Sequence, residues 1–344
     1  VDMREELMNN NRSIFSKSLH EGIIESLSRN EQVILFLNRR GFSTFVSCRK
    51  CGYVFKCKKC DISLTYHNSS EYLTCHYCGE KEKISKTCPN CGSSYVKYFG
   101  VGTEKIEQEI NRIFPSARTL RMDFDTTRKK NSYEYIYNTF KNNQADILIG
   151  TQMVAKGLDF KNVTLVGVIA ADLSLNLPDF RAFERTFQLL TQVSGRAGRG
   201  SKEGKVVIQT YNADNLTIQY AADNDYDSFY KNEIMMREVM DYPPFTNILV
   251  ITMSSEDENL LIKNTQNVGE NLKYKIKHND KITLLGPCPC GVSKIKNFYR
   301  WQIIIKGNIE QTIAEEIKKS VYESVKNVYT SIRVSIDINP SNMI

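Results

Sequence analysis

Four C-x-x-C pairs constrain this chain more than any other feature of its sequence. Eight thiolates at this spacing complete two closed, tetrahedral four-cysteine sites, which zinc favours in structural roles. The chain has ten cysteines and no secretory signal sequence, which argues for metal binding and against disulfides. In chain order, the pairs are Cys48 and Cys51, Cys57 and Cys60, Cys75 and Cys78, and Cys88 and Cys91.

A glycine follows the second cysteine in three of the four pairs, at Gly52, Gly79 and Gly92. This pattern predicts a tight turn whose backbone amides point at the sulfurs. Sequential, crossed and nested pairings would each supply four sulfurs per ion. In the nested arrangement, pairs 48/51 and 88/91 hold one ion and pairs 57/60 and 75/78 hold the other, so an inserted module can leave and re-enter its host domain at one place. We expect His67 and His76, which lie inside the module, to be bystanders.

Composition leaves the partner of the chain open. The formal net charge of +7 is modest and does not by itself indicate a nucleic-acid partner. The basic cysteine-rich stretch is equally consistent with nucleic-acid contact and with a zinc module that has a solvated surface. No apolar run is long enough to span a membrane, and the polar start predicts no signal peptide, so we expect a cytoplasmic protein. Val1 and Asp2 look like a cut inside a longer protein.

Alternating strands and helices predict a parallel, doubly wound sheet, a RecA-like lobe. The expected strands lie at 33–37, 117–122, 145–150 and 163–171 and around Val206. The 344 residues allow two or three domains. We expect a discontinuous lobe (1–47 and 95–240), a zinc-binding insertion (48–94) and a C-terminal α+β domain (241–344). The β-α-β-β-α-β order of the last domain is ferredoxin-like. Its Cys288 and Cys290 are expected to be ordinary thiols.

The stretch 150–200 carries two linked segments that suggest phosphate chemistry. G-T-Q-M-V-A-K-G (150–157) ends an apolar strand, and a helix is expected to close on Q-V-S-G-R-A-G-R (192–199). Arg196 and Arg199 are three residues apart and are predicted to lie on one helical face, where a γ-phosphate could be met by an arginine finger. An isolated R-A-G-R is common at solvated helix ends, but the two segments together resemble motifs V and VI of superfamily-2 helicases.

Other candidate contacts with nucleic acid lie outside these segments. Arg39 and Arg40 follow a strand at its carboxyl end, where ligands bind in open sheets, although a solvated basic turn is as consistent with the pattern. Thr103 begins a helix and can offer amides to a phosphate or act as the N-cap. Arg300 and Trp301 present planar faces on which a base could stack, whereas Trp301 also suits a strand core.

Over nearly its whole length the chain resembles the C-terminal portion of the primosomal protein N′ family, the PriA-type replication-restart helicases of bacteria. The resemblance implies an ATP-driven 3′→5′ DNA helicase acting at abandoned replication forks, nested zinc sites and a C-terminal domain that helps bind branched DNA. Implied partners are forked and single-stranded DNA, single-strand DNA-binding protein, other primosome proteins and the replicative helicase loader. The segments that carry the resemblance are F-L-N-R-R-G-F (36–42), the eight cysteines, G-V-G-T-E (100–104), the two motifs above, M-R-E-V-M-D-Y-P-P-F (236–245) and Y-R-W-Q (299–302).

The same resemblance assigns roles to single residues. It favours Arg199 as the arginine finger, with Arg196 as its positioning neighbour and Gln192 orienting water or nucleotide. Further implied contacts are Gly157, Asp159 and Gly195 to the nucleotide, and Thr151 and Gln152, besides the residues above, to DNA. Asn339 departs from the aspartate that relatives tend to carry.

A first lobe would be needed to complete the enzyme. ATP and Mg²⁺ would be held by that lobe, and because no Walker A or Walker B segment is found in the sequence, we expect these 344 residues to be inactive alone. Two alternatives remain open. One is a RecG-type branched-DNA translocase, which would bind no zinc. The other is a non-catalytic zinc module that docks DNA and partner proteins, with the RecA-like lobe only as a scaffold.

Overall fold

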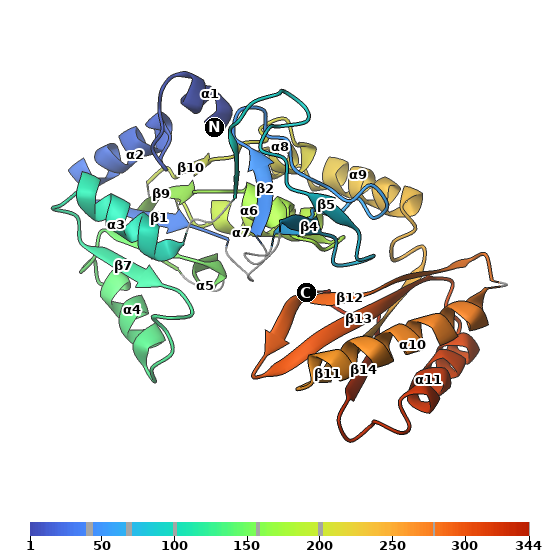
Figure 1. Ribbon diagram of the computed structural model, residues 1–344. Coiled ribbons are helices and arrows are strands. Elements are labelled where there is room, and N and C mark those ends of the chain that lie inside the picture. The colour runs from blue at the N-terminus through green and yellow to red at the C-terminus, as the bar shows by residue number, and fades with distance from the viewer. Residues whose placement is uncertain are drawn as a thin grey trace.

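Three β-sheets form the framework of the protein (Figure 1). The computed structural model describes residues 1–38, 44–66, 71–98, 102–155, 159–198, 202–277 and 279–343. The first sheet is parallel, the second belongs to the cysteine-rich segment, and the third forms the C-terminal domain. Among the described residues, no helix combines the length and apolar character needed to cross a membrane.

The parallel sheet confirms the predicted RecA-like lobe. Its strands are β1 (Gln32–Phe36), β7 (Thr119–Met122), β8 (Ile147–Gly150), β9 (Val163–Val168) and β10 (Lys205–Ile208). Their order across the sheet is β10-β9-β1-β8-β7, and every neighbouring pair is parallel. All five strands were expected from the sequence, whereas their order was not assigned.

Both faces of this sheet are covered, because successive strand residues point to opposite sides. Val33 and Leu35 of β1 pack with helices α2 (Lys17–Ser28) and α3 (Thr103–Ile113). Ile34 and Phe36 pack on the other side. That second face carries α4 (Ser132–Lys141), α5 (Gln152–Ala155), α7 (Ala182–Ser194), α8 (Leu216–Ala222) and α9 (Tyr226–Val239). The short helices α1 (Met3–Met8) and α6 (Asp172–Leu175) complete the lobe.

The cysteine-rich segment folds around its own antiparallel sheet. The strands are β2 (Thr44–Cys48), β3 (Thr65–Tyr66), β4 (Tyr72–Thr74), β5 (Lys81–Lys83) and β6 (Val96–Tyr98), in the order β5-β4-β3-β2-β6. β2, which ends at the first cysteine, and β6, which follows the last one, pair directly with each other. The module therefore leaves and re-enters the lobe at one place, as the nested arrangement requires. The exact domain limits stay a prediction.

The C-terminal domain has the expected β-α-β-β-α-β order. It consists of β11 (Asn247–Ser255), α10 (Glu258–Ile276), β12 (Ile282–Ile295), β13 (Phe298–Gly307), α11 (Gln311–Ser324) and β14 (Arg333–Ile338). The strand order is β12-β13-β11-β14, with antiparallel neighbours. Leu249 and Ile251 face α10 and α11, whereas Ile248 and Val250 face the cysteine-rich segment. The domain thus docks on that segment through one face of its sheet (Figure 1).

Candidate functional site

The structure gathers the eight cysteines into two sets of four. We call Cys48, Cys51, Cys88 and Cys91 the outer set, and Cys57, Cys60, Cys75 and Cys78 the inner set; within each set all sulfurs lie within 4.8 Å of one another. The Sγ–Sγ distances are 3.7 Å for Cys48–Cys91, and 3.6 Å for both Cys51–Cys88 and Cys57–Cys78. Four sulfurs at about 2.3 Å from one tetrahedral zinc ion would be about 3.8 Å apart. The grouping is the nested one, and both sets fit zinc.

All four pairs share one turn geometry. The amide of the residue after the second cysteine donates to the carbonyl of the first, at 2.9 Å in each turn, from Gly52, Asp61, Gly79 and Gly92. These four residues have positive φ angles of 75°, 51°, 79° and 68°, a region in which glycine carries no Cβ penalty. The turn predicted for the three glycine pairs is therefore present, and Asp61 adopts it without a glycine.

The thiols within a set perturb one another. A hydrogen bond from Cys60 is the main cause that lowers the pKa of Cys75 to about 6. Burial, in contrast, raises the pKa of Cys48 to about 12. Zinc binds thiolates, so a divalent cation would take the place of the thiol protons in each set.

Histidine does not join either set within the described part of the chain. His76 is buried between two inner ligands, and its Nδ1 lies 3.0 Å from the carbonyl oxygen of Pro289 in the C-terminal domain. His67 lies outside the described residues. Cys288 and Cys290 are buried and belong to neither set, which fits the expectation of ordinary thiols.

Polar side chains meet at the carboxyl ends of three neighbouring strands, β1, β8 and β7. Gln152 Nε2 donates to Asn38 Oδ1 at 3.0 Å, and the Thr103 hydroxyl donates to Asp123 Oδ2 at 2.6 Å. The Thr151 amide donates to the Met122 carbonyl at the same edge. The sequence pattern assigns no role to Asn38 or Asp123, although each lies within two residues of the carboxyl end of a strand, which is the available signal.

Thr103 does not act as the N-cap that the sequence also allowed. Gly102 occupies the N-cap position of α3, and Thr103 is the first residue of the helix. Its hydroxyl donates to Asp123, so Thr103 can offer a ligand its backbone amide at the helix start, but its side chain does not cap the helix. Arg39 and Arg40, expected near this edge, lie outside the described residues.

The predicted helical face with two arginines is wrong in its geometry. Helix α7 ends at Ser194, Gly195 is its C-cap, and Arg196 lies in the following turn, where its amide donates to the Val193 carbonyl. The chain leaves the helix here because glycine and small residues do not sustain it. Arg199 and Gly157 lie outside the described residues.

This turn lies at the amino ends of the strands, whereas the Thr151 group lies at their carboxyl ends. The Gly198 amide donates to the carbonyl of Val163, the first residue of β9, at 3.1 Å. Asp159 precedes the same strand by four residues in the sequence. Gln192 is exposed on the last turn of α7, and Arg196 is half-buried. Among the described residues, the first segment therefore begins at the carboxyl end of β8, and the second ends beside the amino end of β9.

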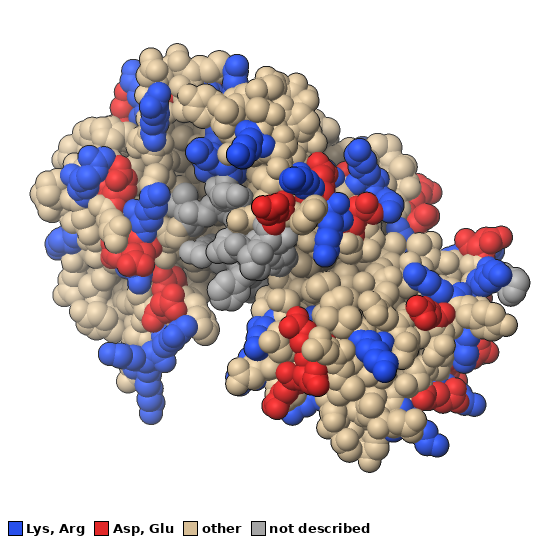
Figure 2. Space-filling view, in the orientation of Figure 1, with Lys and Arg blue, Asp and Glu red and all other residues tan. Residues whose placement is uncertain are grey.

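Arg300 and Trp301 do not form a joint platform. Adjacent residues of a strand point to opposite faces of the sheet. Trp301 packs against the core under α10 and α11, whereas the next-but-one neighbour of Arg300, Gln302, contacts the cysteine-rich segment. The core role that the sequence allowed for Trp301 is the one the fold supports. On the face shown in Figure 2, basic and acidic side chains are interspersed, in keeping with the modest net charge.

Comparison with protein families finds three matches along the chain. The helicase conserved C-terminal domain matches residues 95–201, the PriA DNA helicase Cys-rich region matches residues 57–83, and the primosomal protein N C-terminal domain matches residues 238–341. The first match includes β7, β8 and β9 of the parallel sheet, the second includes the inner cysteine set, and the third includes the C-terminal sheet.

Curated relatives match the chain from end to end. Replication restart protein PriA of Bacillus subtilis (strain 168) is 46% identical over 100% of this chain and 42% of the relative. The protein of the same name from Synechocystis is 42% identical over 99% of this chain and 41% of the relative. The one from Chlamydia trachomatis serovar D is 39% identical over 99% and 45%. The chain thus spans less than half the length of these relatives.

Proposed function

This chain belongs to the PriA family of replication restart proteins, and we propose that the full-length protein is an ATP-dependent 3′→5′ DNA helicase. It would recognise stalled or abandoned replication forks and start primosome assembly there. The chain described above supplies the second helicase lobe, the zinc module and the C-terminal DNA-binding domain. The observation that carries this proposal is a parallel helicase-type lobe interrupted by two four-cysteine sets, in a chain 46% identical to a PriA over its whole length.

In the proposed mechanism, ATP and Mg²⁺ bind between this lobe and a first lobe that carries the Walker segments. Arg199 reaches the γ-phosphate as the finger and stabilises the charge of the transition state, a contribution of about 10³ to 10⁵ in rate. Arg196 positions it, and Gln192 orients water or nucleotide. Asp159, Gly157 and Gly195 complete the nucleotide side.

In this proposal, translocation depends on the chain segment that runs from the carboxyl end of β8 to the amino end of β9. Thr103, Thr151 and Gln152 at the carboxyl edge hold DNA, together with Arg39, Arg40 and Arg300. Thr151 and Gln152, which contact DNA, and Asp159, which contacts the nucleotide, belong to one continuous segment. Closure of the nucleotide cleft therefore moves the residues that bind DNA. Support comes from the position of that segment, which starts at the Gly150 end of β8 and finishes before β9.

The two cysteine sets each hold one structural zinc ion. A closed set of four thiolates leaves no open position for catalysis, so the ions supply cross-links between loops. The sets favour a PriA-type protein over a RecG-type translocase, which would need no zinc. Forked and single-stranded DNA, single-strand DNA-binding protein, other primosome proteins and the helicase loader are the proposed partners, and the cytoplasm is the proposed location.

Removal of the finger tests this function. In the full-length protein, Arg199→Ala should lower DNA-stimulated ATP turnover by about 10³-fold or more, because it removes the guanidinium that stabilises the charge of the transition state. The matched control is Arg29→Ala, an exposed arginine beyond α2 that should leave turnover unchanged. Forked-DNA binding by fluorescence anisotropy and a zinc content near two should persist in both variants. Wild-type turnover by Arg199→Ala would overturn the assignment.

A further inference from the structure

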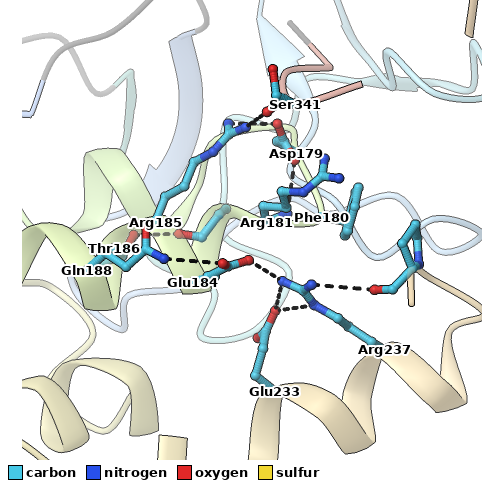
Figure 3. Close-up of polar contacts among 12 residues, drawn as sticks. Asp179, Phe180, Arg181, Glu184, Arg185, Thr186, Gln188, Glu233, Arg237 and Ser341 are labelled. Atoms are coloured by element: carbon cyan, nitrogen blue, oxygen red, sulfur yellow. Dashed lines mark hydrogen bonds and ion pairs between the residues drawn. The ribbon is translucent and has the colours of Figure 1, made fainter. Parts of the chain in front are cut away.

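The guanidinium of Arg237 joins the helix α9 to the helix α7. Its Nη2 lies 2.6 Å from Glu184 Oε2 on α7 and 2.8 Å from Glu233 Oε1 on α9 (Figure 3). The Arg237 side chain is only 15% exposed. Arg237 belongs to the 236–245 segment, to which neither the sequence nor the proposed function gave a role. A planar fork bound to two carboxylates fixes the relative position of the two helices more strictly than a single contact would.

Glu184 passes this constraint along α7. Its second oxygen accepts a hydrogen bond from Gln188 Nε2 at 3.2 Å, one turn further along the helix. Gln192, the residue proposed to orient water or nucleotide, follows one turn later. Glu184, Gln188, Gln192 and Arg237 all line the same cavity of about 380 Å³ between α7 and α9. We call Glu184, Gln188 and Gln192 the α7 stripe. It begins at the residue that contacts Arg237 and ends at Gln192, which is proposed to face the nucleotide.

Arg237 is itself held from the side of the zinc module. Its guanidinium lies 5.4 Å from the centre of the Phe180 ring, and that ring stacks on Tyr242 at 4.7 Å. The Tyr242 hydroxyl donates to the carbonyl of Cys60, an inner ligand, at 3.1 Å. One contiguous set of contacts thus runs from the inner cysteine set to the start of α7.

The C-terminal tail contacts the same helix start. Arg181 Nη1 donates to the Pro340 carbonyl at 2.9 Å, and Arg185 pairs with the buried carboxylate of Asp179 at 2.8 Å. The Arg185 guanidinium also donates to the Ser341 carbonyl, as Figure 3 shows. These contacts hold the start of α7 and the residues before it. Arg237, in contrast, bonds to Glu184, which belongs to the α7 stripe that ends at Gln192.

We propose that Arg237 is a positioning residue for ATP hydrolysis, acting through Glu184 to hold α7 so that Gln192 and the following arginine turn meet the nucleotide. This inference rests on the proposed function. Arg237 touches no reacting atom in it; its effect is to fix the helix that carries the groups that do. Small displacements of such groups are costly, since misplacement by about 1 Å can lower a rate by about 10²-fold.

The experiment compares Glu184→Gln with Glu233→Gln, two isosteric changes at the two carboxylates that bind Arg237. In the full-length protein, Glu184→Gln should lower kcat for DNA-stimulated ATP hydrolysis by about tenfold, with KM for ATP little changed, and Arg237→Gln should have the same effect. Glu233→Gln is the matched control: it loses a bond to the same guanidinium, but Glu233 lies on α9 itself, so kcat should change by less than about twofold. Arg237→Lys, which keeps the charge but not the fork, should lie between wild type and Arg237→Gln.

A merely stabilising role would give a different pattern. Turnover is therefore measured well below the unfolding temperature of each variant and divided by the active fraction from forked-DNA titration. Because Glu184→Gln changes only one atom of a half-exposed side chain, it keeps the proposal testable even if Arg237→Gln fails to fold. The double variant should be no slower than either single one, since both remove the same contact. Equal kcat for wild type and Glu184→Gln, or equal losses in Glu184→Gln and Glu233→Gln, would overturn the inference.

Arg199→Ala in the same assay separates this inference from the proposed function. If Arg199→Ala is inactive while Glu184→Gln and Arg237→Gln turn over normally, the helicase assignment stands and the positioning role falls. If Arg199→Ala itself turns over normally, the proposed function fails first.

Discussion

The outer and inner cysteine sets have the same ligands and the same turns, yet they occupy different environments. The outer set reaches the surface at one end: Cys48 and Cys88 are buried, but Cys51 is half-buried and Cys91 is exposed. In the inner set three of the four cysteines are buried, and they pack with Tyr242, Ile248 and Ile304 of the C-terminal part of the chain. An identical local motif can therefore close a surface loop or form the centre of a domain junction.

Contacts with the rest of the molecule follow the same division. The carbonyl of His76, inside the inner set, accepts hydrogen bonds from Gln302 Nε2 at 2.6 Å and from Cys288 Sγ at 3.2 Å. The outer set meets only the lobe in these contacts: Gly52 lies against the Tyr211 carbonyl, and Arg49 Nη1 donates to the Tyr211 hydroxyl at 2.7 Å. The inner set thus joins the lobe to the C-terminal domain, whereas the outer set fastens the module to the lobe.

The largest expected effect comes from removing one ligand of each set. Cys75→Ser should destabilise the protein by about 4 kcal/mol or more, because loss of the inner ion also loosens the junction with the C-terminal domain. Cys91→Ser, at the exposed end of the outer set, should cost about half as much. Zinc content should fall from about two to about one in both variants, so thermal unfolding followed by circular dichroism separates them. Equal losses of stability would remove the distinction between the sets.

A second comparison divides the outer set itself. Gly52 and Gly92 both have positive φ, but a Cβ on Gly52 would lie 2.3 Å from the Tyr211 carbonyl oxygen, whereas a Cβ on Gly92 would meet nothing within 4 Å. Gly92→Ala should cost about 1 to 2 kcal/mol from backbone strain alone. Gly52→Ala should cost about 3 kcal/mol or more, since backbone must shift as well. Chemical denaturation measures the free energy of unfolding of both variants. Similar losses would show that the Tyr211 backbone moves away at little cost.

The smallest expected effect is kinetic. On treatment with a mercurial reagent that attacks thiolates, the outer zinc should be released at least about tenfold faster than the inner one, because a reagent reaches Cys91 without prior opening of the fold. A chromogenic zinc indicator would show two phases of equal amplitude. Cys91→Ser should abolish the fast phase and keep the slow one. A single phase would mean that both sets open together.

Much of the site was predictable because its geometry is local. Each cysteine turn is closed by hydrogen bonds between residues four or five apart, such as Gly79 to Cys75, so spacing alone indicates it. The strands of the lobe followed from their apolar runs. The helix predicted to run to Arg199 ends earlier, at Ser194, because propensity defines helix ends poorly.

Other features depend on residues that lie far apart in the chain. The sequence could suggest a stacking role for Trp301 or a core role, and only the packing of α10 and α11 on β13 decided between them. Asn339, noted only as a departure, has a positive φ of 47°, and its side chain bonds both the Ile248 amide and Asn247. Aspartate could accept from the Ile248 amide but could not donate to Asn247, so the amide suits this position.

By itself, the sequence determined that eight thiolates form two four-cysteine sets, that they lie in an insertion within a parallel lobe, and that a ferredoxin-like domain follows. Tertiary structure alone decided which set becomes the junction, and that Arg237 reaches Glu184 across 53 positions of the chain. The physical reason is range: turns and strands are fixed by neighbours within a few residues, whereas burial and long-range ion pairs arise only when separate elements pack together.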